Sequence, residues 1–397
     1  MTIGERIACC RRRRGMSQEV LAGLVGRSID WLSKVENNRI ELDRLSVIRA
    51  VATALGVSVG DLVPDVSSSS RAPMGNGDGA LPAIREALTD YRIVMAIGYP
   101  PAGGPSTITQ LAHDVAALWE AYQASRFTYV ASRLPWLLAR AQTTADHDGD
   151  RARAHRLLGL SYQLAAVQLT KFGEAELALV AAERGLIAAR QTGDVAVHMS
   201  LARSVVHALL SLGRCAQAIR LAEAATSMLR RTTASFTPEV ISVYGTLFLA
   251  GAIAAARAGD RSTTRSFLAA AEVAARRLGG DANYLWTAFG TTNVAIHRVA
   301  VAGELGDVQT VIDLGVKINA SSLPLERRVR NAIELARAYS SWNRSDDALA
   351  TLLDAERMAP EQVHHHYLSK RLVVDLIRRR HGTPSATLVA FAKRLNV

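Results

Sequence analysis

The sequence predicts an all-α protein in which a small N-terminal domain precedes a long array of helices. Two short segments with helical patterns meet at Gly26, near the start of the chain. Beyond residue 105, apolar residues recur with a period of about 3.6, with only short breaks. Alanine is abundant and only 5% of the 397 residues are aromatic, which suits close-packed helices better than sheets. A chain of this length exceeds one ordinary domain.

The two segments that meet at Gly26 have the pattern of a helix-turn-helix. Leu21 and Ala22 belong to an apolar stripe on the first segment, and Leu32 and Val35 form one on the second. Ala22 is small where two helices must cross closely, and Gly26 permits a tight turn between them. The second helix of this motif is free to enter the major groove. Double-stranded operator DNA is therefore the first partner to consider.

Residues 3–62 resemble the phage-repressor (XRE) family of helix-turn-helix domains. The elements that match the family pattern are, in chain order, Arg14-Gly15, Ser17-Gln18, residues 36–38 and residues 54–58. One departure is Asn38, where glycine is usual, but asparagine is the next best residue at a left-handed helix end. Another is Arg27, where an aliphatic residue is commoner. The resemblance implies a five-helix domain over residues 1–63.

The resemblance also implies which residues face DNA: Gln18, Arg27, Ser28, Ile29, Asp30, Lys34, Asn37, Asn38 and Arg39. Gln18 and the last three should contact phosphates, which fix register without reading sequence. Lys34 can donate to guanine, and Ile29 can pack on a thymine methyl group. Asp30 can accept from cytosine N4 or serve the helix start. Ser28 can contact a base or cap the helix, and we favour capping for both residues.

Three further side chains of this domain are expected to pack. By the same resemblance, Arg11 and Glu36 form a buried ion pair that ties the first helix to the recognition helix. The alternative is that Arg11 belongs to a solvated run with residues 12–14. Trp31 is expected at the edge of the domain core, and a base-stacking role is the alternative.

The net charge of +11 fits a polyanionic partner. Residues 1–63 contain ten basic and seven acidic side chains, so most of the net positive charge lies beyond the predicted DNA-binding domain. Charge alone would not have located that domain, whereas the motif does.

Composition predicts a flexible linker over residues 64–80, which are rich in serine, glycine and proline. From residue 81 to residue 397, turn residues followed by alanine-rich helices recur about every 37 to 47 residues, as in helix-hairpin solenoids. These turn residues are Gly173, Gly213, Gly259, Gly306 and Asn343.

The last repeat resembles the tetratricopeptide (TPR) pattern. The residues that match it are Leu335, Ala336, Tyr339, Ala348, Leu352, Ala355 and Pro360. Other repeats are longer, so the resemblance implies a degenerate, TPR-like, right-handed α-solenoid with a concave surface. The whole chain is similar to bacterial one-component regulators with an XRE head and a TPR-like body, including actinobacterial families and the peptide-pheromone (RRNPP) group.

A mixed aromatic and polar stripe is expected on one helix, from about residue 283 to residue 303. Trp286, Asn293 and His297 share this stripe, with Phe289 alongside. An asparagine can hold a peptide backbone, and an aromatic ring offers an apolar wall. Tyr162, Tyr244, Arg330 and Asn331 are plausible neighbours on other repeats. The stripe predicts a peptide or small-molecule effector site, and ordinary packing between repeats is the alternative.

The sequence shows no P-loop, GxSxG, HExxH or dinucleotide-binding turn, so we expect no enzyme and no cofactor. Three cysteines give no zinc spacing, and no metal is expected. No run of about 18 apolar residues suggests a membrane span. The sequence favours a cytoplasmic, nucleoid-associated, homodimeric one-component transcriptional regulator. The alternatives are an interaction scaffold or antitoxin- or defence-type component tethered to DNA by its head, and an enzyme regulated by DNA binding.

Overall fold

The structure, a computed structural model, describes residues 2–40, 45–55, 80–89, 107–147, 149–232, 235–379 and 384–397, together with residues 42, 57 and 62. The chain divides into two compact units, which we call the head (residues 1–74) and the body (residues 75–397, less the turn Arg257–Gly259). Within the described ranges, the regular structure is helical apart from one isolated bridge between Ala282 and Phe289. The all-α prediction is confirmed, whereas the expected linker falls almost wholly outside the described residues.

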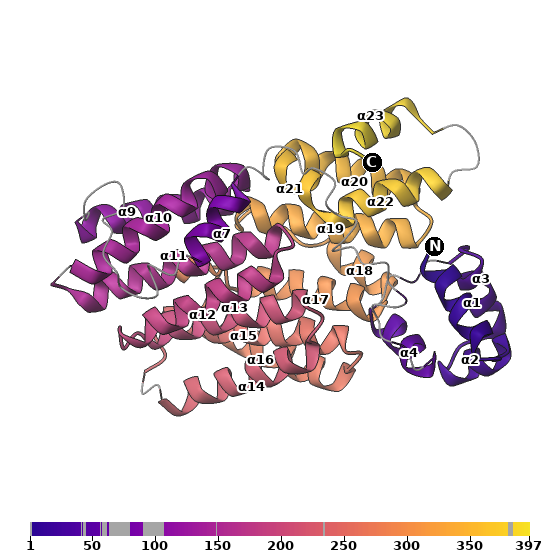
Figure 1. Ribbon diagram of the computed structural model, residues 1–397, viewed down its shortest axis with the longest axis horizontal. Helices are drawn as coiled ribbons and strands as arrows, with labels where there is room; N and C mark the ends of the chain where they lie inside the picture. Colours follow the sequence, from indigo (N-terminus) through magenta and orange to yellow (C-terminus); the bar gives the residue numbers. More distant parts are fainter. Residues whose placement is uncertain are drawn as a thin grey trace. The chain divides into compact units, whose positions relative to one another are not determined.

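The described helices of the head are α1 (Ile3–Arg13), α2 (Gln18–Leu24), α3 (Ile29–Glu36) and α4 (Leu45–Leu55), as Figure 1 shows. They pack around one core that includes Ile7, Leu21 and Leu32. α1 crosses α3 closely, since a Cβ on Gly4 would lie 2.1 Å from the carbonyl oxygen of Val35. The fifth helix expected from the sequence lies outside the described residues, except for the buried Leu62.

The turn between α2 and α3 follows from two local signals. Gly26 has a φ of 65°, and its N–H and that of Arg27 donate to the carbonyls of Gly23 and Ala22. This pair of bonds is a Schellman motif, which needs a left-handed residue after the helix and so favours glycine. Ser28 then caps α3 by accepting a hydrogen bond from the N–H of Trp31 at 3.1 Å. The motif therefore holds α3 at a fixed angle to α2.

The body consists of paired helices with short turns. In chain order its helices are α7 (Leu81–Thr89), α9 (Ile108–Gln123), α10 (Phe127–His147), α11 (Arg151–Lys171), α12 (Ala175–Arg190), α13 (Val195–Ser211), α14 (Cys215–Thr232), α15 (Pro238–Arg257), α16 (Arg261–Leu278), η1 (Tyr284–Trp286), α17 (Thr291–Leu305), α18 (Val308–Gly315), α19 (Leu325–Ser341), α20 (Ser345–Met358), α21 (Pro360–His365), α22 (Tyr367–Arg379) and α23 (Ala386–Leu395). Neighbouring pairs pack on one another along the chain.

Each turn that the sequence marked has a left-handed residue. Gly173, Gly213, Gly259 and Gly306 have φ between 71° and 81°, and Asn343 has a φ of 61°. They end α11, α13, α15, α17 and α19, the first helix of each pair. The same position between α9 and α10 holds Ser125, with a φ of 60°, so one more pair precedes those recognised from glycine spacing.

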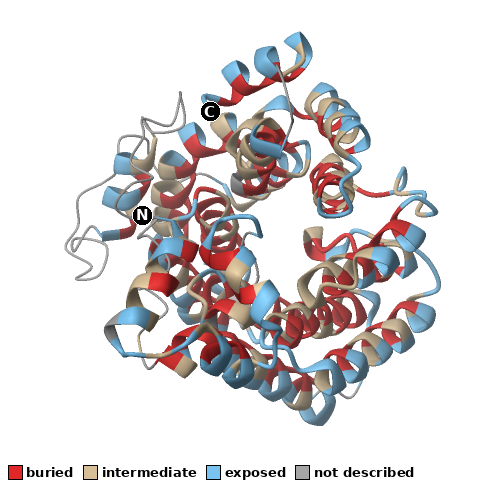
Figure 2. Cartoon of the chain, turned by 90° about the vertical axis from the view of Figure 1, so that its right-hand side faces the viewer, coloured by how far each residue is buried: buried red, intermediate tan, exposed pale blue. Residues whose placement is uncertain are grey.

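Paired helices of the body curve until early and late members of the array meet. α9 contacts α19, and α10 contacts α21. In Figure 2 the buried residues lie where neighbouring helices of the array face one another. The Ser125 hydroxyl donates to Gln362 Oε1 at 2.7 Å, and the N–H of Thr128 donates to Glu361 at 2.9 Å. A serine stands at this turn because its hydroxyl reaches α21, which a glycine could not do.

α15 corrects the expectation about apolar runs. It is the one helix within the described residues that is long and apolar enough to cross a membrane, with a mean hydropathy of 1.6 over 18 residues. However, 78% of that window is buried inside the body. α15 is apolar on all sides because α16, α17 and the preceding pairs cover it, which is typical of a core helix.

Close packing around α15 gives a first prediction. A Cβ on Gly245 would lie 1.9 Å from the ring of Phe289, which is buried. Gly245→Ala should therefore destabilise the body by about 1–3 kcal/mol, the usual cost of overpacking. Urea unfolding of the full chain, followed by circular dichroism, measures the loss. Gly149→Ala is the matched control, because no atom lies within 4 Å of that Cβ. Equal midpoints for the two variants would contradict the packing described.

Candidate functional site

Glu36 is the point at which three helices of the head meet. Arg11 donates from Nε to Oε1 at 2.6 Å and from Nη2 to Oε2 at 2.8 Å. Gln18 Nε2 donates to Oε2 at 2.8 Å. Arg11 also donates from Nη1 to the carbonyl of Met16 at 2.7 Å, which ties the turn after α1 to the same cluster. The carboxylate of Glu36 is buried, so these bonds set the positions of α1, α2 and α3.

The cluster keeps Glu36 ionised. Burial by itself raises the pKa of Glu36, but hydrogen bonds from Arg11 and Gln18, with the charges of Arg11 and Arg12, lower it below its usual value. The hydrogen bond to Glu36 also raises the pKa of Arg11. Arg12 is exposed, and its Nε donates to the carbonyl of Ala8 in its own helix.

The exposed face of α3 presents three of the residues expected to read DNA. Ile29 is 47% exposed, although it is an isoleucine at a helix start. Lys34 Nζ and Asp30 Oδ2 form an exposed ion pair at 2.6 Å. Ser28 is committed to capping, as the hydrogen bond from Trp31 shows. This leaves Ile29 and the Asp30–Lys34 pair as the side chains that α3 offers to a groove.

Arg27, Trp31 and Gln18 have partners within the head. The guanidinium of Arg27 lies over the Trp31 ring, 5.5 Å from its centroid. Trp31 also packs against the head core, so its ring is at the domain edge. One N–H of the Gln18 amide is used on Glu36, so a phosphate contact from this side chain would use its other N–H.

Asn37, Asn38 and Arg39 follow the last turn of α3. Asn37 Nδ2 donates back to the carbonyl of Ser33 at 2.8 Å. Asn38 takes the left-handed position with a φ of 58°, as glycine would, and its Oδ1 accepts from the Thr2 hydroxyl at 2.6 Å. The Arg39 side chain is exposed. These residues form the end of α3 that the resemblance assigned to phosphate contacts.

Thr2 was not predicted from the sequence to have a structural role in the head. It caps α1, because its hydroxyl accepts from the N–H of Glu5 while Glu5 accepts from the N–H of Thr2. The spacing Thr-x-x-Glu is the capping-box signature and could have been recognised. Through Asn38, Thr2 also joins the start of α1 to the end of α3.

The helix expected over residues 283–303 is wrong at its N-terminal end. Trp286 lies in the short helix η1, and α17 begins only at Thr291. Leu285, Trp286 and Ala288 are left-handed, with φ of 48°, 52° and 49°. The apolar residues of this segment recur with a helical period, but the backbone that buries them is not helical.

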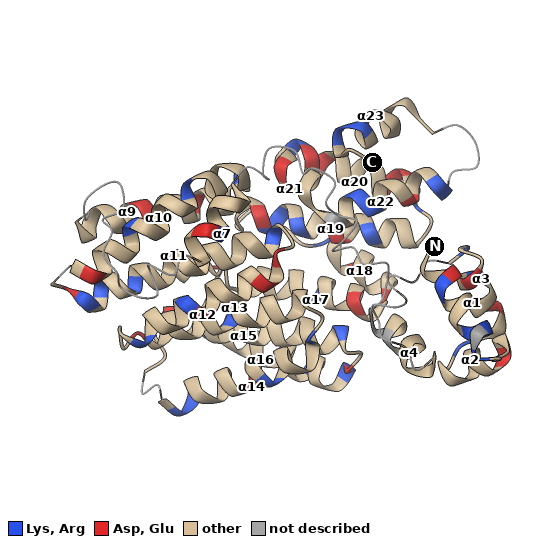
Figure 3. Ribbon diagram, viewed as in Figure 1, with Lys and Arg blue, Asp and Glu red and all other residues tan. Residues whose placement is uncertain are grey.

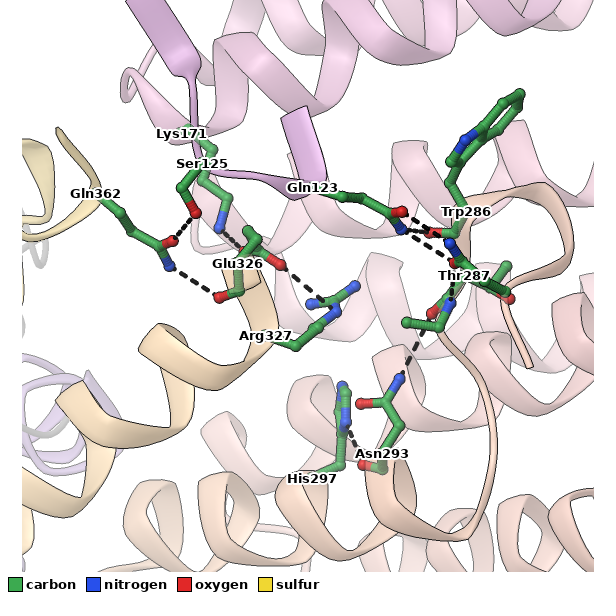
Figure 4. A network of polar contacts seen from close by, with 12 residues as sticks. Gln123, Ser125, Lys171, Trp286, Thr287, Asn293, His297, Glu326, Arg327 and Gln362 are labelled. Atoms are coloured by element: carbon green, nitrogen blue, oxygen red, sulfur yellow. Dashed lines mark hydrogen bonds and ion pairs between the residues drawn. The ribbon is translucent and has the colours of Figure 1, made fainter. Parts of the chain in front are cut away.

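The aromatic members of the expected stripe are packing residues. Trp286 stacks on Trp119 with ring centroids 5.0 Å apart, and its carbonyl accepts from Gln123 at 3.1 Å. Phe289 fills the space above Gly245. Figure 4 shows Trp286 joined through Gln123 to α9, on the opposite side from Asn293. Trp286 and Phe289 therefore do not line a common face with Asn293.

The polar members divide into two groups. Tyr162 is buried, and Tyr244 is half-buried against two phenylalanines, so both belong to the packing between helices. Asn293 is fully buried, with Nδ2 at 3.5 Å from the carbonyl of Thr287. His297 Nδ1 bonds the carbonyl of Asn293 at 2.9 Å and is half-buried. Burial, and then the charges of nearby arginines that include Arg327 and Arg330, lower the pKa of His297.

Asn331, the remaining member, is nearly buried on α19, and its Oδ1 lacks a hydrogen-bond partner within the described residues. His297 and Arg330 are thus two expected ligand residues with partly buried side chains, near enough for their charges to interact. The stripe predicted from α17 alone is replaced by a set of residues from several helices.

Comparison with known proteins identifies the head. Residues 2–65 match the family model described as a helix-turn-helix domain. No curated protein and no solved structure is found to match the chain. The matched segment contains the capped α1, the α2–α3 turn and the Glu36 cluster described above. The chain therefore carries an N-terminal helix-turn-helix domain, the kind of domain found in DNA-binding regulators.

The Glu36 cluster gives a second prediction, on acid stability. Because the folded pKa of Glu36 is lowered, its stabilisation is present above the unfolded pKa, about 4.3, and is lost as pH falls through the folded pKa. Glu36→Gln removes the buried negative charge that pairs with the part-buried Arg11, which should cost on the order of 3 kcal/mol near pH 7. Hydrogen exchange of the α1–α3 amides in the full chain measures this cost.

Glu19→Gln is the matched control, because Glu19 is an exposed acid at the start of α2. It should leave the protection of α1–α3 unchanged. As the pH falls from about 5 to about 3, the Glu36→Gln variant should also lose less stability than the parent, because the variant has no carboxyl at this position to take up a proton. Equal acid sensitivity in parent and variant would show that Glu36 is not the group that responds.

Proposed function

We propose that the protein is a one-component transcriptional regulator whose head, of the XRE type, binds operator DNA through α3. This proposal rests on the exposed face of α3, where Ile29 and Lys34 project from a helix that Glu36 and Ser28 hold in place. An apolar side chain beside a cation suits the thymine methyl group and guanine edge of the major groove. The protein would act inside the cell, where operator DNA is, and the proposal includes no catalytic step.

The Asp30–Lys34 pair gives α3 a means of discrimination. On free protein the two charges neutralise each other across one helical turn. A guanine edge would compete with Asp30 for the Lys34 ammonium, whereas a cytosine N4 would satisfy Asp30. Sequences that offer neither would leave a carboxylate facing the polyanion. The same two side chains would thus favour some base pairs and disfavour others.

Sequencing the DNA that co-purifies with the protein in cells would supply the operator for a third prediction. In a binding titration, Lys34→Ala should weaken operator binding by about 1–3 kcal/mol and relax the preference at one base pair. Arg39→Ala should instead weaken all sequences about equally and reduce the slope of log K against log salt by about 0.9.

Arg220→Ala is the control for both variants, because Arg220 is an exposed arginine of α14 in the body. It should bind the operator as the parent does. A double variant of Ile29→Ala and Lys34→Ala with unchanged operator affinity would sink the assignment of α3 to the groove.

The body, on this proposal, is a TPR-like right-handed solenoid that dimerises and senses an effector. The left-handed turn residues at the end of each first helix, and the packing of each pair on the next, support the repeat architecture. A dimer is expected because operator symmetry normally mirrors a two-fold axis of the protein. Val180 and Ile187 lie seven residues apart on α12, and both are exposed aliphatic side chains on one face.

The fourth prediction concerns this face. The full-length protein should run as a dimer in light scattering, and Ile187→Asp should shift it toward monomer, because a charge replaces a side chain that is 61% exposed in the single chain. Val316→Asp, at an exposed valine after α18, is the control and should remain dimeric. A monomeric parent would overturn the dimer itself, and a dimeric Ile187→Asp variant would move the interface elsewhere.

A further inference from the structure

Helices α11, α13 and α19 of the body carry basic side chains that the proposed DNA-binding face does not include. Figure 3 shows basic residues along α19. These include Arg327 and Arg330, whose charges act on Lys171 of α11, and the charge of Arg327 also acts on Arg203 of α13. Residues from α11, α13 and α19 thus surround one region, although they are 32 to 159 positions apart in the sequence.

The carboxylates of this region do not balance its cations. Glu326 is buried and contacts both Lys171 and Arg327, the second at 3.6 Å (Figure 4). In Figure 4 the Arg327 side chain extends from Glu326 toward Asn293 and His297. One carboxylate is therefore shared between two cations, and the region keeps a positive charge.

The next acid along α19 is shared in the same way. Glu334 is buried and lies 3.8 Å from Arg330 and 2.9 Å from Arg337. Within the described residues, therefore, Glu326 and Glu334 are each shared between two cations, and Arg203 is not one of them.

Arg203 has no carboxylate of its own in the described part of the chain. It is only 5% exposed, and its Nε has no hydrogen-bond partner there. Burial, and then the charge of Arg327, lower the pKa of Arg203 to about 10. A buried guanidinium without an acceptor is costly, and in folded proteins such groups normally have a partner. Arg203 is thus an unsatisfied donor in a region that already has excess positive charge.

Three histidines lie in the electrostatic field of these arginines. His207 of α13, His297 of α17 and His366 after α21 have lowered pKa values, first because of burial and then because of nearby arginines. For His297 the value falls to about 3. These histidines are neutral at pH 7, so they add donors and acceptors without adding charge.

The chemistry that fits this region is an oxyanion. A planar guanidinium binds a carboxylate or phosphate through two parallel hydrogen bonds, and the low polarity around a buried site strengthens them. Duplex DNA cannot supply the anion, because Arg203 is enclosed by helices of the body and a duplex is wider than any gap between packed side chains. A small molecule or a short peptide end can.

We propose that the inner face of the body binds a small oxyanionic ligand, one that carries a carboxylate or a phosphate group, through Arg203, Arg327 and Arg330. As an effector site this rests on the proposed function, but as a binding site it does not. The ligand would give Arg203 its missing acceptor and would offset the charge that Glu326 and Glu334 leave unbalanced. The orphan Oδ1 of Asn293 would accept from a hydroxyl or N–H of the same ligand.

Calorimetric titration and thermal unfolding of the full chain test the site with inorganic phosphate and with citrate, against chloride at equal ionic strength. Saturable binding of either probe, with a rise in Tm that chloride does not give, supports the site. Phosphate alone would indicate a phosphate ester as ligand, and citrate alone a carboxylate. No saturable binding of either probe up to about 10 mM would overturn the proposal, because a ligand this weak gains almost nothing from buried guanidinium groups.

Arg203→Met and Arg330→Gln should each lower the affinity for the probe about 10- to 100-fold, as expected for loss of a hydrogen bond to a charged group. Arg330 is partly exposed, so its variant keeps the test available even if Arg203→Met does not fold. Arg203→Met should also raise the Tm of the ligand-free chain, because it removes an unpaired buried charge. Arg220→Gln is the matched control and should bind as the parent does.

Undiminished probe binding in both Arg203→Met and Arg330→Gln would place the anion elsewhere and overturn the proposal. The titrations contain no DNA, so they fail or succeed independently of operator binding. Anion binding without operator binding would refute the regulator and keep the site. Operator binding without anion binding would do the reverse.

Discussion

The fold of the body depends on how one buried carboxylate is satisfied. Glu326 lies at the start of α19, and it contacts Lys171 of α11 while its backbone carbonyl accepts from Gln362 of α21 at 3.0 Å. Burial alone would raise the pKa of Glu326, but the charges of Lys171 and Arg327 hold it well below its usual range. Burial also lowers the pKa of Lys171, an effect that Glu326 opposes, and the direct contact between the two favours the ionised pair. Taking these charges out of water is costly, so only the closed arrangement of the helices, which brings them together, satisfies both.

The head relies on a similar device over a shorter distance. Glu36 accepts from Arg11 and Gln18, so three helices of a small domain are oriented by one acid. In the head, the carboxylate of Glu36 accepts hydrogen bonds from Arg11 and Gln18, and the described cations Arg12, Arg27, Lys34 and Arg39 are exposed. In the body, Glu326 and Glu334 are each shared between two cations, and Arg203 is buried without a carboxylate in the described part of the chain. On the functions proposed, the head would bind an extended anion at its surface, and the body would bind a small one among its helices.

Structure could be predicted from the sequence where a backbone constraint favours one or two residue types. Gly26 and the repeat glycines were found because a left-handed turn favours glycine, and Asn343 because asparagine is the next choice. Ser125 was missed, since its left-handed conformation is supported by a hydrogen bond to Gln362 that no local pattern records. Trp286 was placed on the wrong element because stacking on Trp119 overrides helical periodicity. The cations of α11, α13 and α19 could not be predicted together, because α11 and α13 contact as neighbours but only the closure of the array brings α19 near them.

Closure of the array also bears on how the chain reaches its native state. An open stack of repeats can nucleate anywhere and grow by contacts between neighbours, so its folding is local and its ends can fray. The Ser125–Gln362 bond instead joins residues 237 positions apart, and closing a loop of that size carries a large entropic cost before any contact rewards it. Its formation is therefore a late event, after the intervening helices have paired. Once formed, it ties the α9–α10 turn to α21, so separating early from late helices must break this contact and the body should unfold as one cooperative unit.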